Sequence, residues 1–138
     1  MAKQTTLYLT QGYNHAAQTF ANADDTTTKL LIAADADDSK ITSISITSSA
    51  TTALDILFYL YNGTTDYLIG HIDIPANSGF DGTVYATNGL NRTNLPWLEL
   101  DGVGNPYIKL KGGWSLRAAM KTTISSGTVT VLVTTEDF

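Results

Sequence analysis

The sequence contains no cysteine, which excludes disulfide bonds and thiolate metal sites. Only 15% of its residues are charged, against about 25% in a typical soluble domain. The net charge is −5, and basic groups supply most of the affinity of proteins for phosphate backbones. No apolar run approaches the ~20 residues of a membrane-spanning helix. We therefore expect neither nucleic acid nor a membrane as a partner.

The N-terminus also lacks a recognisable targeting segment. In MAKQTTLYLT, one lysine is followed by polar residues, without the apolar core of a signal peptide. We therefore expect the protein to be made and assembled inside a cell.

The length of 138 residues suits one domain. Residues 1–25 are predicted to form an N-terminal arm or edge strand. This arm either packs on its own domain or reaches a neighbouring subunit. Within it, residues 6–10 are a predicted strand and residues 11–14 a predicted turn or loop. Residues 26–138 are predicted to form a single β-sandwich domain.

The stretch 54–74 combines the longest apolar pattern with a turn at its middle. Apolar residues fall at every second position before and after Asn62-Gly63, so each half can bury one face as a strand. Asn-Gly is typical of tight hairpin turns. The pattern predicts two paired strands at the middle of a sheet, with Tyr59 and Tyr61 on the opposite face of the first strand.

Other segments alternate in the same way. Strands are predicted over residues 28–34, 40–48, 80–87 and 107–110. Two further strands, beginning near Trp114 and Val129, are predicted to close one sheet. Between residues 91 and 100, Asn94 and Pro96 suit the cap and first turn of one short helical turn.

About eight strands separated by turn signals predict an all-β fold. The expected architecture is an antiparallel β-sandwich, either jelly-roll-like or immunoglobulin-like, with at most one short helical turn near Pro96. The sequence pattern does not decide between the two topologies.

His71 and Asp73 are the strongest candidates for chemistry. Two residues apart on one strand, they share a face, so the carboxylate is placed to orient the imidazole as a general base. No nucleophile is placed beside them, which favours a hydrogen-bonded surface or interface pair. We therefore predict no catalytic residues and no enzymatic activity.

Two acidic clusters raise the question of calcium, which takes closely spaced carboxylate oxygens as ligands. One is Asp24-Asp25, and the other comprises Asp35, Asp37 and Asp38. The spacing lacks the glycine and terminal glutamate of an EF-hand loop, which favours solvated turns. We predict no metal site and no cofactor.

Trp97 and Trp114, with seven tyrosines, are residue types that stack on sugars. Such aromatics more often fill a core or an oligomer interface. The sequence favours the second interpretation and leaves sugar binding as an alternative.

Two blocks of the sequence resemble small β-sandwich virion proteins of tailed bacteriophages. They are residues 57–83, LFYLYNGTTDYLIGHIDIPANSGFDGT, and residues 95–133, LPWLELDGVGNPYIKLKGGWSLRAAMKTTISSGTVTVLV. The shared pattern is a strand, a polar turn, a strand ending in the IPANSG corner, and later a glycine, the SLRA strand and a β-branched final strand.

This resemblance implies a structural role in a virion, without catalysis. The first choice within the group is a capsid decoration or cement protein, which sits on the head as a homotrimer and braces neighbouring subunits of the major capsid protein. The alternatives are a tail, neck or fibre component and a receptor-binding module that recognises carbohydrate.

Overall fold

Alternating apolar and polar residues form strands that bury one face each. In β3 (Ser39–Ser48), Ile44 and Ile46 are buried, while Ser45 between them is half-buried. In β10 (Val129–Asp137), three alternate valines are fully buried and the intervening residues face outward. The predicted strands at these positions are confirmed.

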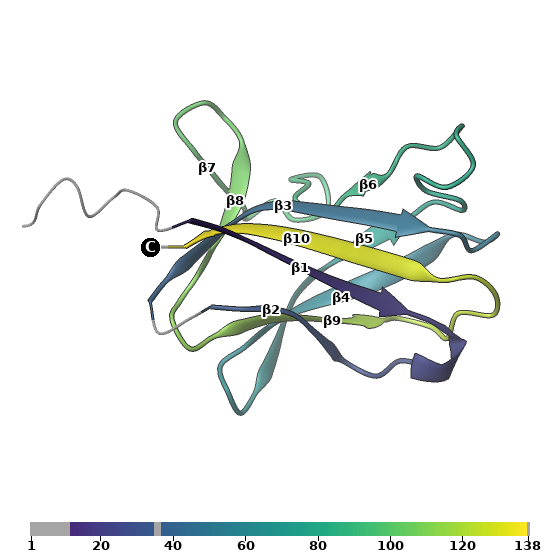
Figure 1. Cartoon of the computed structure of the whole chain (residues 1–138), viewed down its shortest axis with the longest axis horizontal. Helices are drawn as coiled ribbons and strands as arrows, with labels where there is room; N and C mark the ends of the chain where they lie inside the picture. The colour runs from purple at the N-terminus through teal and green to yellow at the C-terminus, as the bar shows by residue number, and fades with distance from the viewer. Residues whose placement is uncertain (1–11, 35–36, 138) are drawn as a thin grey trace, which may run out of the picture.

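The computed structural model describes residues 12–34 and 37–137, which form two antiparallel sheets packed face to face (Figure 1). Sheet A has the order β1 (Gly12–Phe20), β10, β3, β8 (Pro106–Leu110) and β7 (Glu99–Leu100), with β6 (Thr87–Asn88) also paired to β3. Sheet B has the order β2 (Lys29–Ala33), β9 (Ser115–Met120), β4 (Leu54–Tyr61) and β5 (Asp66–Ile74). The predicted all-β sandwich is confirmed.

The strand pairs are nested along the chain, which identifies the topology. Among the described residues, eight strands have five residues or more, and they pair as β1 with β10, β2 with β9, β3 with β8, and β4 with β5. This is the pairing of a long hairpin rolled into two sheets, a jelly roll. In an immunoglobulin-like sandwich the first two strands share a sheet, whereas β1 and β2 lie in different sheets here.

The core lies between the two sheets, and both contribute to it. Phe58 and Ile56 point inward from β4, and Ile41 and Ile46 point inward from β3, all with no exposed surface. Full burial of such a side chain stabilises the fold by about 1.5–3 kcal/mol. The sandwich is therefore held by the apolar half of each alternating strand.

The central hairpin forms as predicted, but its place and its turn differ from the prediction. β5 is an edge strand of sheet B, so the pair does not lie at the middle of a sheet. The connection has four residues, and the Asn62 carboxamide oxygen accepts hydrogen bonds from the backbone N–H groups of Thr64 and Thr65 at 2.9 and 2.8 Å. A two-residue type I′ turn needs positive φ at both positions, and of Asn62 and Gly63 only the glycine has it, at 104°.

The prediction that the last two long strands close one sheet is wrong. β9 pairs with β2 and β4 in sheet B, whereas β10 pairs with β1 and β3 in sheet A. Both strands bury one apolar face, and alternation alone does not say which sheet receives it. The connection between them crosses the sandwich.

The predicted strand over residues 80–87 is wrong except at its last residue. The Asp81 carboxylate accepts hydrogen bonds from the backbone N–H groups of Thr83 and Val84 at 2.9 and 3.2 Å, which holds the chain in a turn. Only Thr87–Asn88 pairs, with β3. Local capping by Asp81 outweighs the β propensity of Val84 and Tyr85.

Near Pro96, where at most one short helical turn was predicted, the chain forms no helix. The Asn91 carbonyl accepts a hydrogen bond from Leu95 N–H at 2.8 Å, and the Leu95 carbonyl accepts one from Leu98 N–H at 3.2 Å, so the segment consists of turns. Within the described ranges, the single helix is the 3₁₀ turn η2 (Asn22–Asp24). It forms because the Asp24 carboxylate accepts a hydrogen bond from Ala21 N–H at 2.8 Å.

The described part of the N-terminal segment belongs to sheet A. The turn predicted over residues 11–14 is wrong from Gly12 onward, because β1 pairs with β10 without interruption from Gly12 opposite Asp137 to Phe20 opposite Val129. β1 is an edge strand, one of the two forms predicted for residues 1–25. The strand predicted over residues 6–10 lies outside the described residues, and contact of the arm with a neighbouring subunit stays a prediction.

Candidate functional site

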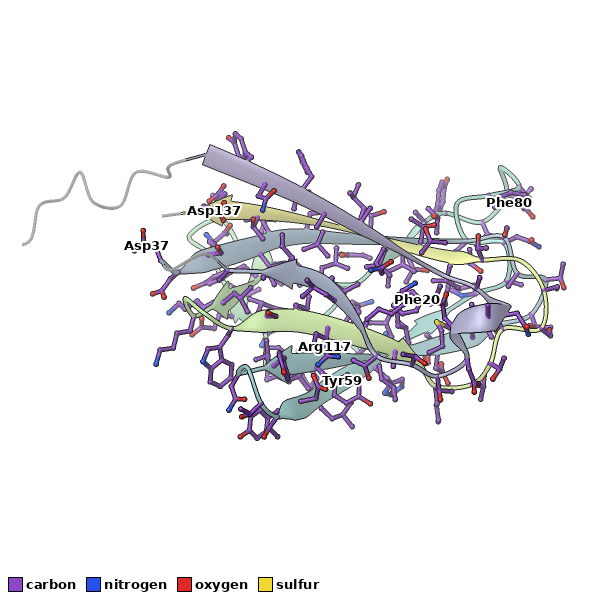
Figure 2. The ribbon with its side chains drawn as sticks, turned by 60° about the horizontal axis from the view of Figure 1, so that its bottom comes forward. Phe20, Asp37, Tyr59, Phe80, Arg117 and Asp137 are labelled. Carbon is purple, nitrogen blue, oxygen red and sulfur yellow. The ribbon has the colours of Figure 1, made fainter. Side chains whose placement is uncertain are left out.

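The outer face of sheet B carries apolar and aromatic side chains across all four strands. Leu30 on β2 lies opposite Arg117 on β9, Arg117 lies opposite Tyr59 on β4, and Tyr59 lies opposite Leu68 on β5. Leu68 is 60% exposed and Leu30 is 49% exposed. We call these four residues the sheet B row; Figure 2 labels its two central members, Arg117 and Tyr59.

Arg117 is fixed within this row. Its Nη1 lies 3.1 Å from Oδ2 of Asp66, and its guanidinium carbon lies 4.5 Å from the centre of the Tyr61 ring. The arginine and aspartate side chains are only 24% and 29% exposed. A guanidinium held between a carboxylate and an aromatic ring loses little freedom on binding a partner, so the row is a preformed surface.

The outer face of sheet A has a different chemistry. The hydroxyl groups of Thr19 and Thr130 lie 3.2 Å apart, and His15 Nδ1 lies 3.1 Å from the Thr134 hydroxyl. Leu132 is a large apolar residue on this face, 43% exposed. Tyr13 on β1 is also exposed on this face, at 76%. The two outer faces therefore differ mainly in the hydroxyl groups of sheet A and in the row of contiguous apolar and aromatic side chains of sheet B.

His71 and Asp73 are brought together as predicted, with His71 Nε2 lying 3.6 Å from Asp73 Oδ1. The sequence analysis missed their third neighbour, Asp55, which lies directly opposite Asp73 across the hairpin. A hydrogen bond with Asp73, then burial, then the charge of Asp73 raise the pKa of Asp55. The register of the hairpin reveals this pair, because Leu54 pairs with Ile74 and the next position inward places Asp55 opposite Asp73.

This cluster is open to solvent. The side chains of His71 and Asp73 are 55% and 69% exposed. A second carboxylate beside Asp55 favours its protonated form, which is why the pKa of Asp55 is raised. The cluster lies on the outer face of sheet B, farther along β4 and β5 than the sheet B row.

The acidic clusters considered for calcium serve as caps and ion-pair partners. Asp24 pairs with Lys29 at 3.2 Å, Asp25 accepts a hydrogen bond from Thr123, and Asp38 accepts one from Gly112 N–H at 2.8 Å. A hydrogen bond from Ala21 N–H, followed by the contact with Lys29, lowers the pKa of Asp24. No three histidine or acidic side chains gather at metal-binding distance within the described ranges; Asp35 lies outside them.

The two tryptophans are engaged within the fold. The Trp114 ring stacks on Tyr67 with 6.3 Å between centroids and 18° between planes. Trp97 Nε1 donates a hydrogen bond to the carbonyl of Ile69 at 2.9 Å. Ile69 is the extra residue at a register shift between β4 and β5, so Trp97 covers a carbonyl on the open edge of β5. Both rings hold structure in place, although Trp97 remains 45% exposed.

Sheet A also contains a groove, bordered by β3, β6 and the turn before β8. Its volume is about 540 Å³. Residues from these segments line it together with Glu136 of β10. We call it the β3 groove; nothing in the sequence analysis pointed to it.

A scan against protein-family models and a search of curated proteins both find no match to this chain. Membership of the virion proteins that residues 57–83 and 95–133 resemble thus stays a prediction. In the part of the chain that the structure describes, no helix has the length and apolar character needed to cross a membrane.

Proposed function

We propose that this protein is a structural component of a tailed-bacteriophage virion. In this proposal it is a capsid decoration or cement protein that binds neighbouring subunits of the major capsid protein, associates as a homotrimer and carries out no catalysis. The resemblance of residues 57–83 and 95–133 to phage virion proteins supports it, as does the two-sheet architecture expected for that group.

The observation that carries the proposal is the sheet B row. Tyrosine and arginine are, with tryptophan, enriched where binding energy concentrates in protein interfaces. Here Tyr59 and Arg117 lie between two exposed leucines on a rigid sheet. Apolar surface transferred from water to an interface contributes roughly 25 cal/mol per Å², so a row of this kind favours association.

Symmetric association increases the affinity that such a surface gives for a lattice of capsid subunits. A homotrimer presents three copies of each contact to a capsid lattice. Once one copy is bound, the others act at a high effective concentration, so weak individual contacts give firm attachment. Low surface charge, with 15% charged residues, is compatible with a protein that works largely covered by neighbours.

The test compares matched leucines on the two outer faces. Leu68→Ser alters the sheet B row, and Leu132→Ser makes the same change on the outer face of sheet A. Native mass spectrometry gives the oligomeric state, and cosedimentation with decoration-free heads of the encoding phage gives capsid binding. We expect Leu68→Ser to weaken trimer formation or head binding about tenfold, corresponding to 1.4 kcal/mol, with Leu132→Ser within about twofold of the wild type.

A monomeric wild-type protein that does not bind heads would contradict the proposal. Binding to purified tails without binding to heads would favour the tail, neck or fibre alternative. Equal losses for Leu68→Ser and Leu132→Ser would show that the sheet B row is not the adhesive surface.

A further inference from the structure

The β3 groove exists because two segments share one edge of β3. β8 pairs with β3 over Ser39 to Ile41, and β6 pairs with it at Ser45 and Ile46. On this edge, no strand lies beside the length of β3 between these two pairings, whereas β10 pairs along the other edge. The opening is thus a consequence of the sheet topology, with Thr42, Ser43 and Ile44 along its floor.

The walls of the groove are held in place by backbone contacts. Gly89 N–H donates a hydrogen bond to the Ile44 carbonyl at 2.8 Å, which ties the β6 side to the floor. On the other side, Asp101 accepts hydrogen bonds from the N–H groups of Val103 and Asn105, both at 2.9 Å. These bonds, with the charge of Lys40 as a smaller cause, lower the pKa of Asp101. Hydrogen bonds therefore fix both walls of the groove.

The lining combines donors, acceptors and one aromatic ring. The Lys40 ammonium lies 4.4 Å from the centre of the Tyr107 ring and opposite Glu136 in the ladder. The side chains of Lys40, Asn105 and Glu136 make no hydrogen bond with another of the described residues. Ammonium, amide, carboxylate and hydroxyl groups are thus available at one site.

The charge of this lining indicates the class of ligand. Lys40 is the single cation among the lining residues. Glu136 lies opposite it in the ladder, and the charge of Lys40 acts on Asp101. Two carboxylates against one ammonium disfavour phosphate and other anions. A partner that is neutral and presents hydroxyl groups in many directions matches both the donors and the acceptors.

We propose that the β3 groove binds a neutral oligosaccharide. Its volume of about 540 Å³ lies within the range of roughly 300–1,000 Å³ typical of small-molecule sites. In this arrangement Lys40 and Asn105 donate hydrogen bonds to sugar hydroxyls, and Glu136 accepts from them. The Tyr107 ring supplies apolar surface. The proposal is independent of the virion role, because it concerns the opposite sheet.

The experiment is an NMR titration of the ¹⁵N-labelled full chain. The probes are neutral hexasaccharides of glucose, mannose, galactose and N-acetylglucosamine in different linkages, with hexagalacturonate as the anionic comparison. We expect at least one neutral probe to cause saturable shifts at the backbone amides of Lys40, Asn88 and Tyr107, with a Kd of about 1 mM or tighter.

Variants identify the site and control for folding. Lys40→Ala and Asn105→Ala are expected to weaken binding about fivefold or more, because each removes a hydrogen-bond donor. The matched control is Lys109→Ala, which removes the lysine directly opposite Lys40 in the ladder without altering the groove lining. It is expected to bind within about twofold of the wild type, and the same spectra report whether each variant is folded.

Three results would overturn this assignment. They are the absence of saturable binding by every neutral probe, stronger binding of hexagalacturonate than of any neutral probe, and shifts that map to sheet B while Lys40→Ala and Asn105→Ala bind like the wild type. None of them affects the test of the virion role, which uses different variants and a different partner.

Discussion

Asp55 on β4 and Asp73 on β5 face each other across the hairpin and share a hydrogen bond that raises the pKa of Asp55 above its ordinary value of 3.8. In the unfolded chain the two groups separate, and Asp55 returns to its ordinary pKa. Just above pH 3.8, Asp55 therefore retains its proton to a greater extent in the folded protein than in the unfolded chain. The contribution of Asp55 to the free energy of unfolding falls as the pH rises through this window, opposite in sign to the contributions of Asp24 and Asp101, whose pKa values are lowered.

The variant Asp55→Asn tests this relationship. It removes the repulsion between two carboxylates at neutral pH and keeps a hydrogen-bonding side chain. Because the pair is partly exposed to water, we expect a modest rise in Tm of about 1–3 °C at neutral pH. In thermal melts across the acidic range, the Tm of Asp55→Asn relative to the wild type should rise with pH, with no difference below the ordinary pKa of aspartate. A lower Tm at neutral pH, or an unchanged slope, would contradict the assignment.

Gly89 tests the packing of the β6 segment on β3. A Cβ atom at this position would lie 2.5 Å from Cγ2 and 2.8 Å from Cβ of Ile44, so Gly89→Ala must push the segment off the sheet. Overpacking of this kind costs about 1–3 kcal/mol, measured by urea denaturation. Gly102→Ala is the control, because a Cβ there meets nothing within 4 Å. Equal stabilities for the two variants would mean that the segment sits farther from β3.

Trp97 covers the open edge of β5, and Trp97→Phe removes its hydrogen bond to the Ile69 carbonyl. We expect a loss of about 0.5–1.5 kcal/mol, faster amide exchange along β5, and more self-association in sedimentation experiments, because uncovered edges pair with other chains. Trp114→Phe should leave β5 exchange unchanged, since its contact is the stacking on Tyr67, which phenylalanine retains. Unaltered exchange in Trp97→Phe would show that the edge is protected by other means.

A double-mutant cycle on Arg117 and Asp66 measures how firmly the sheet B row is anchored. With Arg117→Met and Asp66→Asn, we expect a coupling free energy of about 0.5–1 kcal/mol, because this pair is more shielded from water than a surface pair. The control cycle uses Lys109 and Glu99, 3.5 Å apart with side chains 71% and 55% exposed. The coupling free energy between Lys109 and Glu99 should approach zero. A larger coupling for Lys109 and Glu99 than for Arg117 and Asp66 would contradict the conclusion that Arg117 is anchored by Asp66.

Much of the fold could be predicted because a strand that buries one face has an apolar residue at every second position. The alternating isoleucines of β3 and valines of β10 identify both strands and their inward faces. Alternation does not encode the partner strand, so β9 and β10 were wrongly placed in one sheet. Where side chains cap the backbone locally, as Asp81 does, strand propensity also misleads. These caps depend on geometry that a pattern of apolar residues does not contain.

The candidate sites also divide into those that neighbouring sequence positions reveal and those that depend on strand pairing. His71 and Asp73 were found because they are close in sequence, whereas Asp55 required the hairpin register. The sheet B row needed the order of four strands, although Tyr59 was correctly placed on the outward face of its strand. The β3 groove brings residues 40–45 together with segments that begin more than 40 residues later in the sequence, and no local signal marks it.

The nested pairing of the strands has a consequence for how the chain reaches this structure. Among the four nested pairs, only β4 and β5 are joined by a short connection, whereas the outermost ladder joins Gly12 to Asp137. Each outer pair closes a longer loop of chain than the pair inside it, and such long-range topology slows folding to the range of milliseconds to seconds. The hairpin from Leu54 to Ile74 is therefore the natural starting point, with β1 among the last strands to be secured, an order that stopped-flow measurements on variants of each ladder can resolve.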